Sequence, residues 1–183
     1  MTVAVPPPDP DGETIKIHAL TVGEGILALS ALPGRGGNLQ GDLHHIADWR
    51  PALVITLVTE DELAEVGASA IGRWLKDHGT KWEHLPIPDF STPDAAASVR
   101  WDRIAEFARR ALLGGGRVLV HCRGGCGRSG MVALRLMIEA GEAPDEALGR
   151  LRCVRPCAIE TDAQMAWAMG DASDAAEAQH DRG

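Results

Sequence analysis

Apolar residues along the chain follow two different spacings. Short runs that are continuously apolar, or that alternate with polar residues, and that are rich in β-branched side chains predict strands. Five such runs occur, at residues 14–20, 25–31, 52–58, 82–87 and 117–120. A Val-Gly-Glu turn separates the first two runs and predicts a hairpin, and the run at 52–58 is expected to be fully buried.

Segments with apolar residues three or four positions apart lie between these runs and predict helices. They lie at about residues 39–49, 60–66, 69–79, 95–114, 131–138, 145–152 and from 161 onward. Asn38, Thr59 and Asp94 precede three of them and are expected to cap their first turns. The long helix is expected to bury Trp101, Ile104 and Phe107. Strands that alternate with helices predict one α/β domain with a mixed sheet.

Composition is that of a globular protein and leaves the charge of its substrate open. The 183 residues are enough for one domain with a full core, and 45% of them are hydrophobic. The formal net charge of −8 argues against nucleic acid or an anionic membrane surface as a partner. Six of these charges lie in residues 1–13 and 171–183. The rest of the chain is nearly neutral, so local arginines must decide whether an anion binds.

The two ends of the chain are expected to lie outside the folded domain. Residues 1–13 contain four prolines and three acids, which predict a disordered extension. Residues 171–183 predict an acidic tail that ends the last helix or is disordered. No apolar run is long enough to span a bilayer, and no secretory signal is visible. We therefore expect a cytoplasmic protein whose domain covers residues 14–170.

The stretch from His121 to Gly130 carries the clearest chemical signal. A buried strand ends there, a glycine-rich loop follows, and a helix begins near Ser129. Glycines allow backbone N–H groups to turn inward, and a helix N-terminus adds partial positive charge, so the loop is suited to hold an oxyanion. Cys122 would lie beneath that anion as a nucleophile, Arg128 would bind two of its oxygens, and His121 would orient the loop through backbone hydrogen bonds. The anion-binding loop comprises Arg123, Gly124, Gly125, Cys126, Gly127 and Arg128.

This stretch resembles the active-site motif of the cysteine-dependent protein phosphatases, in which a histidine and a cysteine are followed by five residues, an arginine and a serine or threonine. That superfamily also carries a general-acid aspartate on a separate loop, with a proline four residues later, and Asp89 and Pro93 match this pattern. Asp94 is the alternative acid, although it is expected to cap a helix. The resemblance implies a protein-tyrosine-phosphatase-like three-layer α/β fold, with a mixed central sheet of about five strands flanked by helices.

Two further stretches are similar to a smaller group within the superfamily. Residues 38–43, together with 54–58, resemble the dual-specificity type. Residues 155–164 resemble a segment of the cyclin-dependent-kinase-associated phosphatase-like branch and its bacterial relatives. The resemblance as a whole covers about residues 14–170.

The resemblance implies a role for each matching residue. Cys122 would be the nucleophile and Arg128 the phosphate clamp. Asp89 would protonate the leaving oxygen and later activate the hydrolytic water. Ser129 would hydrogen-bond the departing thiolate, and Gln164 would place the water. No metal and no other cofactor are implied.

The residues and the resemblance together predict a phosphoprotein phosphatase that acts on phosphotyrosine and on phosphoserine or phosphothreonine, and we expect a monomer. A phosphoinositide or small phosphate ester is an alternative substrate, although Arg123 is the only extra basic residue of the loop. The sequence suggests no partner within the chain for Arg123, which would meet the substrate at the rim of the loop. A rhodanese-like sulfurtransferase also holds an anion over a reactive cysteine. A phosphate-binding module without activity is a further alternative.

Two of the four cysteines depart from the family pattern. Cys126 stands where relatives usually carry another residue, and Cys157 stands where they carry glycine. Cys126 would either form a disulfide with an oxidised Cys122 or pack as a small apolar group under the loop. Cys153 and Cys157 are expected to be small core residues, because structural disulfides are uncommon in cytoplasmic proteins. The paired spacing of the cysteines leaves a zinc site as an alternative.

Overall fold

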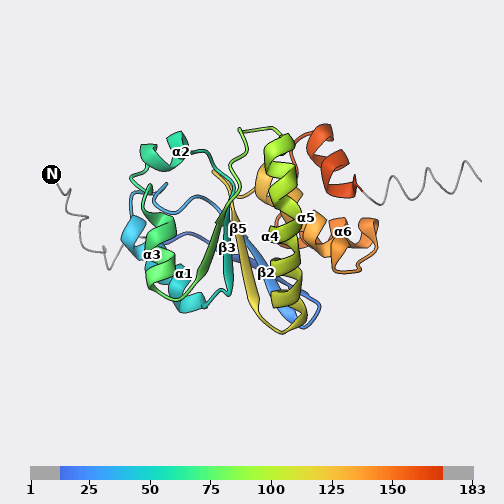
Figure 1. Cartoon of the computed structure of the whole chain (residues 1–183), viewed down its shortest axis with the longest axis horizontal. Coiled ribbons are helices and arrows are strands. Elements are labelled where there is room, and N and C mark those ends of the chain that lie inside the picture. Colours follow the sequence, from blue (N-terminus) through green and yellow to red (C-terminus); the bar gives the residue numbers. More distant parts are fainter. Residues whose placement is uncertain (1–12, 171–183) are drawn as a thin grey trace, which may run out of the picture.

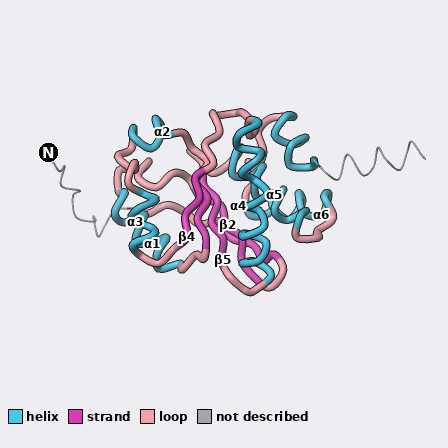
Figure 2. Tube along the Cα trace, in the orientation of Figure 1, coloured by secondary structure: helices cyan, strands magenta, loops and turns pink. Residues whose placement is uncertain are grey.

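The centre of the fold is a five-stranded mixed sheet, which a computed structural model describes together with the rest of residues 13–170 (Figures 1 and 2). In spatial order its strands are β1 (His18–Val22), β2 (Gly25–Ser30), β5 (Arg117–His121), β3 (Leu53–Thr56) and β4 (Lys81–His84). β1 pairs antiparallel with β2, and all other neighbours pair parallel. The predicted hairpin and the mixed five-stranded sheet are confirmed. The predicted extension and the acidic tail lie outside the described residues, apart from Glu13.

Helices cover both faces of the sheet. They are α1 (Leu39–Trp49), α2 (Glu60–Glu65), α3 (Ile71–Asp77), α4 (Ala95–Leu113), α5 (Gly127–Glu139) and α6 (Pro144–Val154), and a further helical segment spans residues 162–170. Figure 1 shows α1 and α3 on one side of the sheet and α4, α5 and α6 on the other, which confirms the three-layer arrangement. Among the described residues, no helix combines the length and the apolar character that crossing a membrane requires.

The two central parallel strands, β3 and β5, are buried on both faces. All four residues of β3 and the three apolar residues of β5 are inaccessible to solvent. A strand enclosed by helices on both faces needs a continuous rather than an alternating apolar run, and this is the pattern that the sequence shows there. Residues that follow the ends of these strands are therefore attached to the buried core of the domain.

Side-chain caps fix where three helices begin. The Asn38 side chain accepts from the Gly41 N–H at 3.1 Å and starts α1. Thr59 and Glu62 form a reciprocal capping box at α2. Asp94 Oδ1 accepts from the Ala97 N–H at 2.8 Å and starts α4. All three predicted caps are confirmed.

The prediction that α4 buries three large side chains holds for two of them. Trp101 and Ile104 are buried, whereas Phe107 is 37% exposed. Successive residues of a helix are rotated by about 100° about its axis. Because the next residue, Ala108, is buried, Phe107 lies at the edge of the buried face. Its ring instead contacts the ammonium group of Lys81 on β4, 4.4 Å from the ring centroid.

β4 ends at His84, before the predicted end of the strand, yet the chain continues beside β3. The N–H groups of Leu85 and Ile87 donate to carbonyls at and just beyond the end of β3, both at 2.9 Å. The alternating prolines of this stretch have no N–H to donate, so the regular ladder stops. These two hydrogen bonds place the loop that follows Ile87 at the carboxyl end of the parallel strands.

One buried carboxylate fastens the start of the domain to α1. Asp42 is 1% exposed, and its two oxygens accept from the Ile15 and Gly34 N–H groups, both at 2.8 Å. Removing this carboxylate would leave two backbone donors without a partner, at a cost of about 1–3 kcal/mol each.

We therefore expect Asp42→Ala to lower the free energy of unfolding by about 2–4 kcal/mol, measured by urea denaturation. Asp48→Ala removes an exposed carboxylate from the same helix and should change the free energy by less than about 0.5 kcal/mol. Equal losses in the two variants would contradict the role assigned to Asp42.

Candidate active site

The predicted anion-binding loop connects the end of β5 to the start of α5. β5 lies between β2 and β3, so the loop emerges from the middle of the sheet at the carboxyl end of a parallel strand. Open α/β sheets bind ligands at this edge. The loop is anchored to its neighbour by the Leu32 N–H, which donates to the Arg123 carbonyl at 3.1 Å.

Gly125 is required at the point where the loop passes the end of β2. Its φ of 71° lies in the left-handed region, and a Cβ there would come 2.7 Å from the carbonyl carbon of Ser30. Any other residue would push the loop away from the sheet. The sequence-based expectation that glycine shapes this loop therefore has a specific steric cause.

Cys122 lies at the base of the loop, almost fully buried. It is 3% exposed, and its Sγ lies 3.3 Å from the Ser129 Oγ in the first turn of α5. The N-terminus of α5, whose free N–H groups carry partial positive charge, begins beside the same thiol. The structure brings the predicted nucleophile and its predicted hydrogen-bonding partner together.

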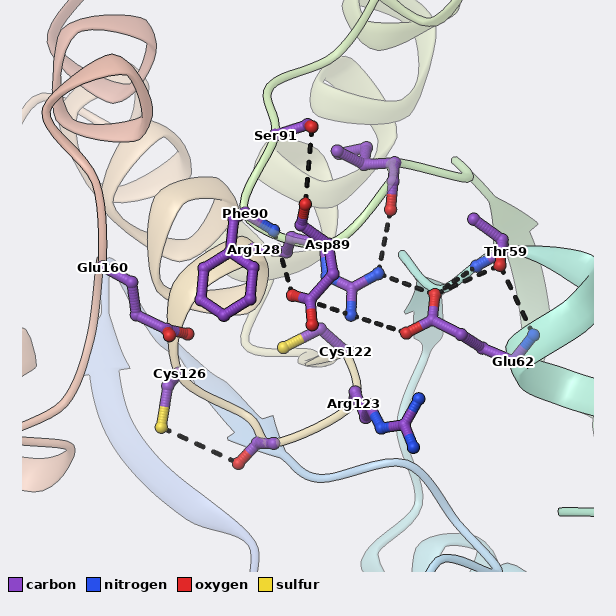
Figure 3. Close-up of polar contacts among 12 residues, drawn as sticks. Thr59, Glu62, Asp89, Phe90, Ser91, Cys122, Arg123, Cys126, Arg128 and Glu160 are labelled. Atoms are coloured by element: carbon purple, nitrogen blue, oxygen red, sulfur yellow. Dashed lines mark hydrogen bonds and ion pairs between the residues drawn. The ribbon is translucent and has the colours of Figure 1, made fainter. Parts of the chain in front are cut away.

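The guanidinium of Arg128 is fixed by a carboxylate that the sequence did not identify. Arg128 is 1% exposed, and its Nη1 and Nη2 donate to the two oxygens of Glu62, both at 2.8 Å. Nη1 also donates to the Ile87 carbonyl at 2.8 Å. This fork-to-fork geometry orients the guanidinium plane as well as holding it in place (Figure 3).

Glu62 uses the same carboxylate to cap α2, where its Oε2 accepts from the Thr59 N–H at 2.9 Å. Burial would raise the pKa of the Glu62 carboxyl, but the hydrogen bonds from Arg128 and from the Thr59 backbone outweigh burial and lower the pKa to about 2. Burial likewise opposes the charge of Arg128, yet its bonds to Glu62 raise the pKa of the guanidinium. Both groups are therefore charged at neutral pH. The sequence predicted Thr59 as the cap of this helix, but it did not indicate that Glu62 also binds Arg128.

Asp89 reaches the site from the loop after β4, which we call the acid loop (residues 88–94). Its Oδ1 lies 3.2 Å from Arg128 Nη2, and its side chain is 46% exposed. Figure 3 shows the Asp89 carboxylate facing the Arg128 guanidinium, with Cys122 beside them. Asp94, the alternative acid, is engaged in capping α4. The geometry favours Asp89.

The residue after Asp89 is held in an uncommon backbone conformation. Phe90 has a φ of 59°, in the left-handed region, and its side chain is 60% exposed. Its N–H donates to Asp89 Oδ1 at 3.0 Å. The turn thus aims the carboxylate inward and leaves an aromatic ring at the rim.

His121 connects the loop to β3 from within the core. Its Nε2 lies 2.7 Å from the Thr56 Oγ1, which also accepts from the Trp82 Nε1–H at 2.8 Å. Complete burial lowers the pKa of His121 to about 4. The ring is therefore neutral at physiological pH. Its role in orienting the loop stays a prediction.

A segment after α6 holds the loop from behind; we call it the brace (residues 155–159). Arg155 Nε donates to the Gly125 carbonyl and Nη2 to the Gly124 carbonyl, both at 2.9 Å. Cys126 and Cys157 form a disulfide with their Cα atoms 5.2 Å apart. The brace belongs to the stretch that resembles the kinase-associated branch, but the sequence did not predict that it contacts the anion-binding loop.

This disulfide corrects the predictions for the cysteines. Cys126 is neither a free thiol under the loop nor linked to Cys122, because its sulfur is bonded to Cys157. Cys153 and Cys157 are exposed rather than part of the core. The expectation rested on the low frequency of structural disulfides in cytoplasmic proteins. That frequency does not indicate which segments of this chain are neighbours in the fold. With two of the four cysteines joined, a four-thiolate zinc site cannot form, and no cluster of three or more candidate metal ligands occurs among the described residues.

Gln164 is fully buried and links the acid loop to the residue that follows the brace. Its Nε2 donates to the Ser91 carbonyl at 3.3 Å, and its Oε1 accepts from the Glu160 N–H at 3.0 Å. A Cβ on Gly127 would lie 3.1 Å from the same Oε1, so the amide borders the anion-binding loop. Its predicted role in placing a water molecule stays a prediction.

Arg123 lies at the rim of the loop, and its side chain is 48% exposed. Contrary to expectation, it has a partner within the chain, because its Nη1 lies 3.3 Å from Glu65 Oε2. The contact depends on how α2 packs beside the loop, which the sequence alone does not give.

Comparison with protein families and with individual proteins gives consistent matches. The family model described as the DSP-PTPase phosphatase domain of Swiss Army Knife proteins matches residues 35–169. The chain is 32% identical to cyclin-dependent kinase inhibitor 3 of Mus musculus over 135 residues, which are 70% of this chain and 63% of that protein. The Homo sapiens protein of the same name is 30% identical over 136 residues. The chain thus spans less than two thirds of the length of these relatives.

Solved structures agree with the fold. Kinase associated phosphatase, with serine in place of its catalytic-site cysteine, superposes with a TM-score of 0.77 at 26% identity and covers 91% of this chain and 98% of its own. Tk-PTP in its active form gives a TM-score of 0.62 at 32% identity, covering 77% and 87%. PTPMT1 in complex with PI(5)P gives 0.68 at 21% identity, covering 88% and 99%, a likeness of fold. The predicted fold class and the resemblance to the dual-specificity type are confirmed.

Breaking the Glu62–Arg128 pair should destabilise the protein strongly. We expect Glu62→Gln to lower the free energy of unfolding by about 3 kcal/mol, because it leaves a buried guanidinium without its counter-charge. Glu65→Gln on the same helix removes only the exposed contact with Arg123 and should cost less than about 1 kcal/mol. Chemical denaturation of both variants measures the difference, and similar values would contradict the assignment.

The depressed pKa of His121 predicts a pH dependence of stability. Because its pKa falls from 6.5 to about 4 on folding, the unfolded chain binds the proton more tightly, so stability is present above pH 6.5 and declines as the pH falls toward 4. His121→Gln should flatten the dependence of the unfolding free energy on pH in this interval. His45→Gln, at an exposed position, should leave it unchanged. An unaltered slope in the His121 variant would disprove the prediction.

Proposed function

Because this chain belongs to the DSP-PTPase phosphatase domain family of Swiss Army Knife proteins, we propose that it hydrolyses phosphomonoesters on protein side chains through a cysteinyl-phosphate intermediate. The observation that carries this proposal is the convergence of a buried thiol, a fixed guanidinium and an aspartate. Cys122 Sγ lies 3.3 Å from Ser129 Oγ, and Asp89 Oδ1 lies 3.2 Å from Arg128 Nη2. We assign the catalytic domain to residues 14–170.

In the first step the Cys122 thiolate attacks phosphorus and forms an S–P bond while the bond to the ester oxygen breaks. Asp89, in its protonated form, gives its proton to the departing oxygen. Arg128 donates to two of the three equatorial oxygens, and backbone N–H groups of the loop stabilise the charge on the third. Glu62 acts as a positioning residue, because it sets the plane in which Arg128 donates.

In the second step a water molecule attacks phosphorus and the S–P bond breaks. Asp89, now a carboxylate, accepts the proton from the water, and inorganic phosphate forms. The Ser129 hydroxyl donates to the sulfur that leaves as a thiolate. Gln164 lies between the acid loop and the anion-binding loop, a position compatible with guiding the water.

The proposed substrates are phosphotyrosine and phosphoserine or phosphothreonine in proteins. Phe90 supports an aromatic substrate, because its exposed ring lies next to Asp89 at the rim, where it could stack on the phenyl group of phosphotyrosine. The relatives named as a kinase inhibitor and a kinase associated phosphatase support a protein substrate. The family match argues against the sulfurtransferase alternative.

Kinetics on an aryl phosphate test the assigned roles. We expect Cys122→Ser to abolish turnover, since the nucleophile is lost, and Asp89→Asn to lower kcat by about 10²–10⁴-fold, since the general acid is lost. Asp94→Asn is the matched control, because it alters only the cap of α4, and its kcat should be near that of the wild type.

Turnover that survives Cys122→Ser would overturn the covalent mechanism, and a larger loss in the Asp94 variant than in the Asp89 variant would exchange the two acids. Peptides carrying phosphotyrosine or phosphoserine, assayed beside a soluble phosphoinositide, determine the substrate class. Preference for the phosphoinositide would replace the proposed protein substrate.

A further inference from the structure

The brace fixes the shape of the anion-binding loop through its backbone. Arg155 donates to two successive loop carbonyls, and the Ile159 N–H donates to the Cys126 carbonyl at 3.2 Å. The Cys126–Cys157 disulfide adds the one covalent link between loop and brace among the described residues, across a sequence separation of 31. The loop is therefore held at its two ends by β5 and α5, and between them by a disulfide to the brace that can be reduced.

We propose that this disulfide is a redox-controlled element of the site. In the oxidised state it holds the loop in the anion-binding conformation, and its reduction by a dithiol, of a protein or of small molecular size, weakens phosphate binding. The inference rests on the proposed phosphatase function, because it concerns the regulation of the same site.

The surroundings of the two sulfurs favour one direction of attack. Cys157 is exposed, whereas Cys126 is partly buried and precedes the first turn of α5. Arg155 Nη2 lies 3.5 Å from the Cys126 sulfur. The guanidinium and the helix N-terminus both stabilise a thiolate at Cys126, which makes it the better leaving group. An incoming thiolate is therefore expected to attack Cys157.

The exchange balances in two steps. The first thiolate of the dithiol forms a mixed disulfide with Cys157 and displaces Cys126 as a thiolate, which then takes up a proton. The second thiol of the reductant, as a thiolate, then attacks the reductant sulfur that is bonded to Cys157. This closes the disulfide of the reductant and releases Cys157 as a thiolate, which takes up a proton. Two electrons pass to the protein, the dithiol becomes a disulfide, and both cysteines end as thiols. Cys122 remains a free thiol throughout.

The expected effect on binding follows from the composition of the loop. Its three glycines give the reduced loop many accessible conformations, and anion binding must then order backbone that the disulfide had already restricted. Ordering one further residue corresponds to about a tenfold loss of affinity. Reduction should thus oppose catalysis, although thiol reagents ordinarily preserve an enzyme whose nucleophile is cysteine.

The test uses the full chain carrying Cys122→Ser, so that oxidation of the nucleophile cannot contribute. Inorganic phosphate is titrated calorimetrically into the oxidised protein and into protein reduced with dithiothreitol, after peptide mapping under non-reducing conditions has identified the Cys126–Cys157 link. We expect phosphate to bind about tenfold more weakly to the reduced protein. The melting temperature should fall by about 10 °C, since a cross-link of this span is lost.

Two cysteine variants in the same background separate the disulfide from other thiols. Cys157→Ala should bind phosphate like the reduced protein and no longer respond to dithiothreitol. Cys153→Ala removes an exposed free cysteine and should retain the full response. The reduced Cys122→Ser protein supplies the same comparison if the Cys157 variant does not fold.

Equal affinities in the two redox states, tighter binding after reduction, or the absence of the mapped link would each overturn the inference while leaving the proposed function intact. Failure of both states to bind phosphate would overturn the proposed function together with this inference.

Discussion

The buried ion pair between Glu62 and Arg128 is the interaction on which the candidate site depends. Each charge is almost inaccessible to solvent, and each satisfies the other through two parallel hydrogen bonds. The same carboxylate closes the capping box of α2. One carboxylate therefore stabilises both the start of a six-residue helix and the orientation of the guanidinium.

Three parallel strands supply the parts of the site from one edge of the sheet. The chain leaving β3 enters α2 and presents Glu62, the chain leaving β4 presents Asp89, and the chain leaving β5 presents Cys122. These residues are far apart in the sequence, yet the parallel pairing aligns the ends of the strands. The sheet thus sets the distances within the site, and the loops only refine them.

The elements and the residues that meet at the candidate site could be predicted from the sequence because their signals are local. The spacing from Cys122 to Arg128 lies within one loop, and the periodicity of each helix and strand is contained in the element itself. Glu62 and Arg155 were missed because their partners lie far along the chain, and only packing brings them together. The cysteine pairing failed for the same reason: the spacing of cysteines does not specify which segments become neighbours.

The order of strands in the sheet also has a consequence for how the chain assembles. β5 is the last strand along residues 13–170, but it lies in the middle of the sheet and pairs with both β2 and β3. Until residues 117–121 have joined, the strands form two separate pairs, β1 with β2 and β3 with β4, and a two-stranded piece has little stability of its own. The strand that closes the sheet is also the strand that ends at the anion-binding loop. Completion of the sheet and placement of the anion-binding loop therefore depend on the same strand, and its pairings with β2 and β3 join residues far apart in the sequence.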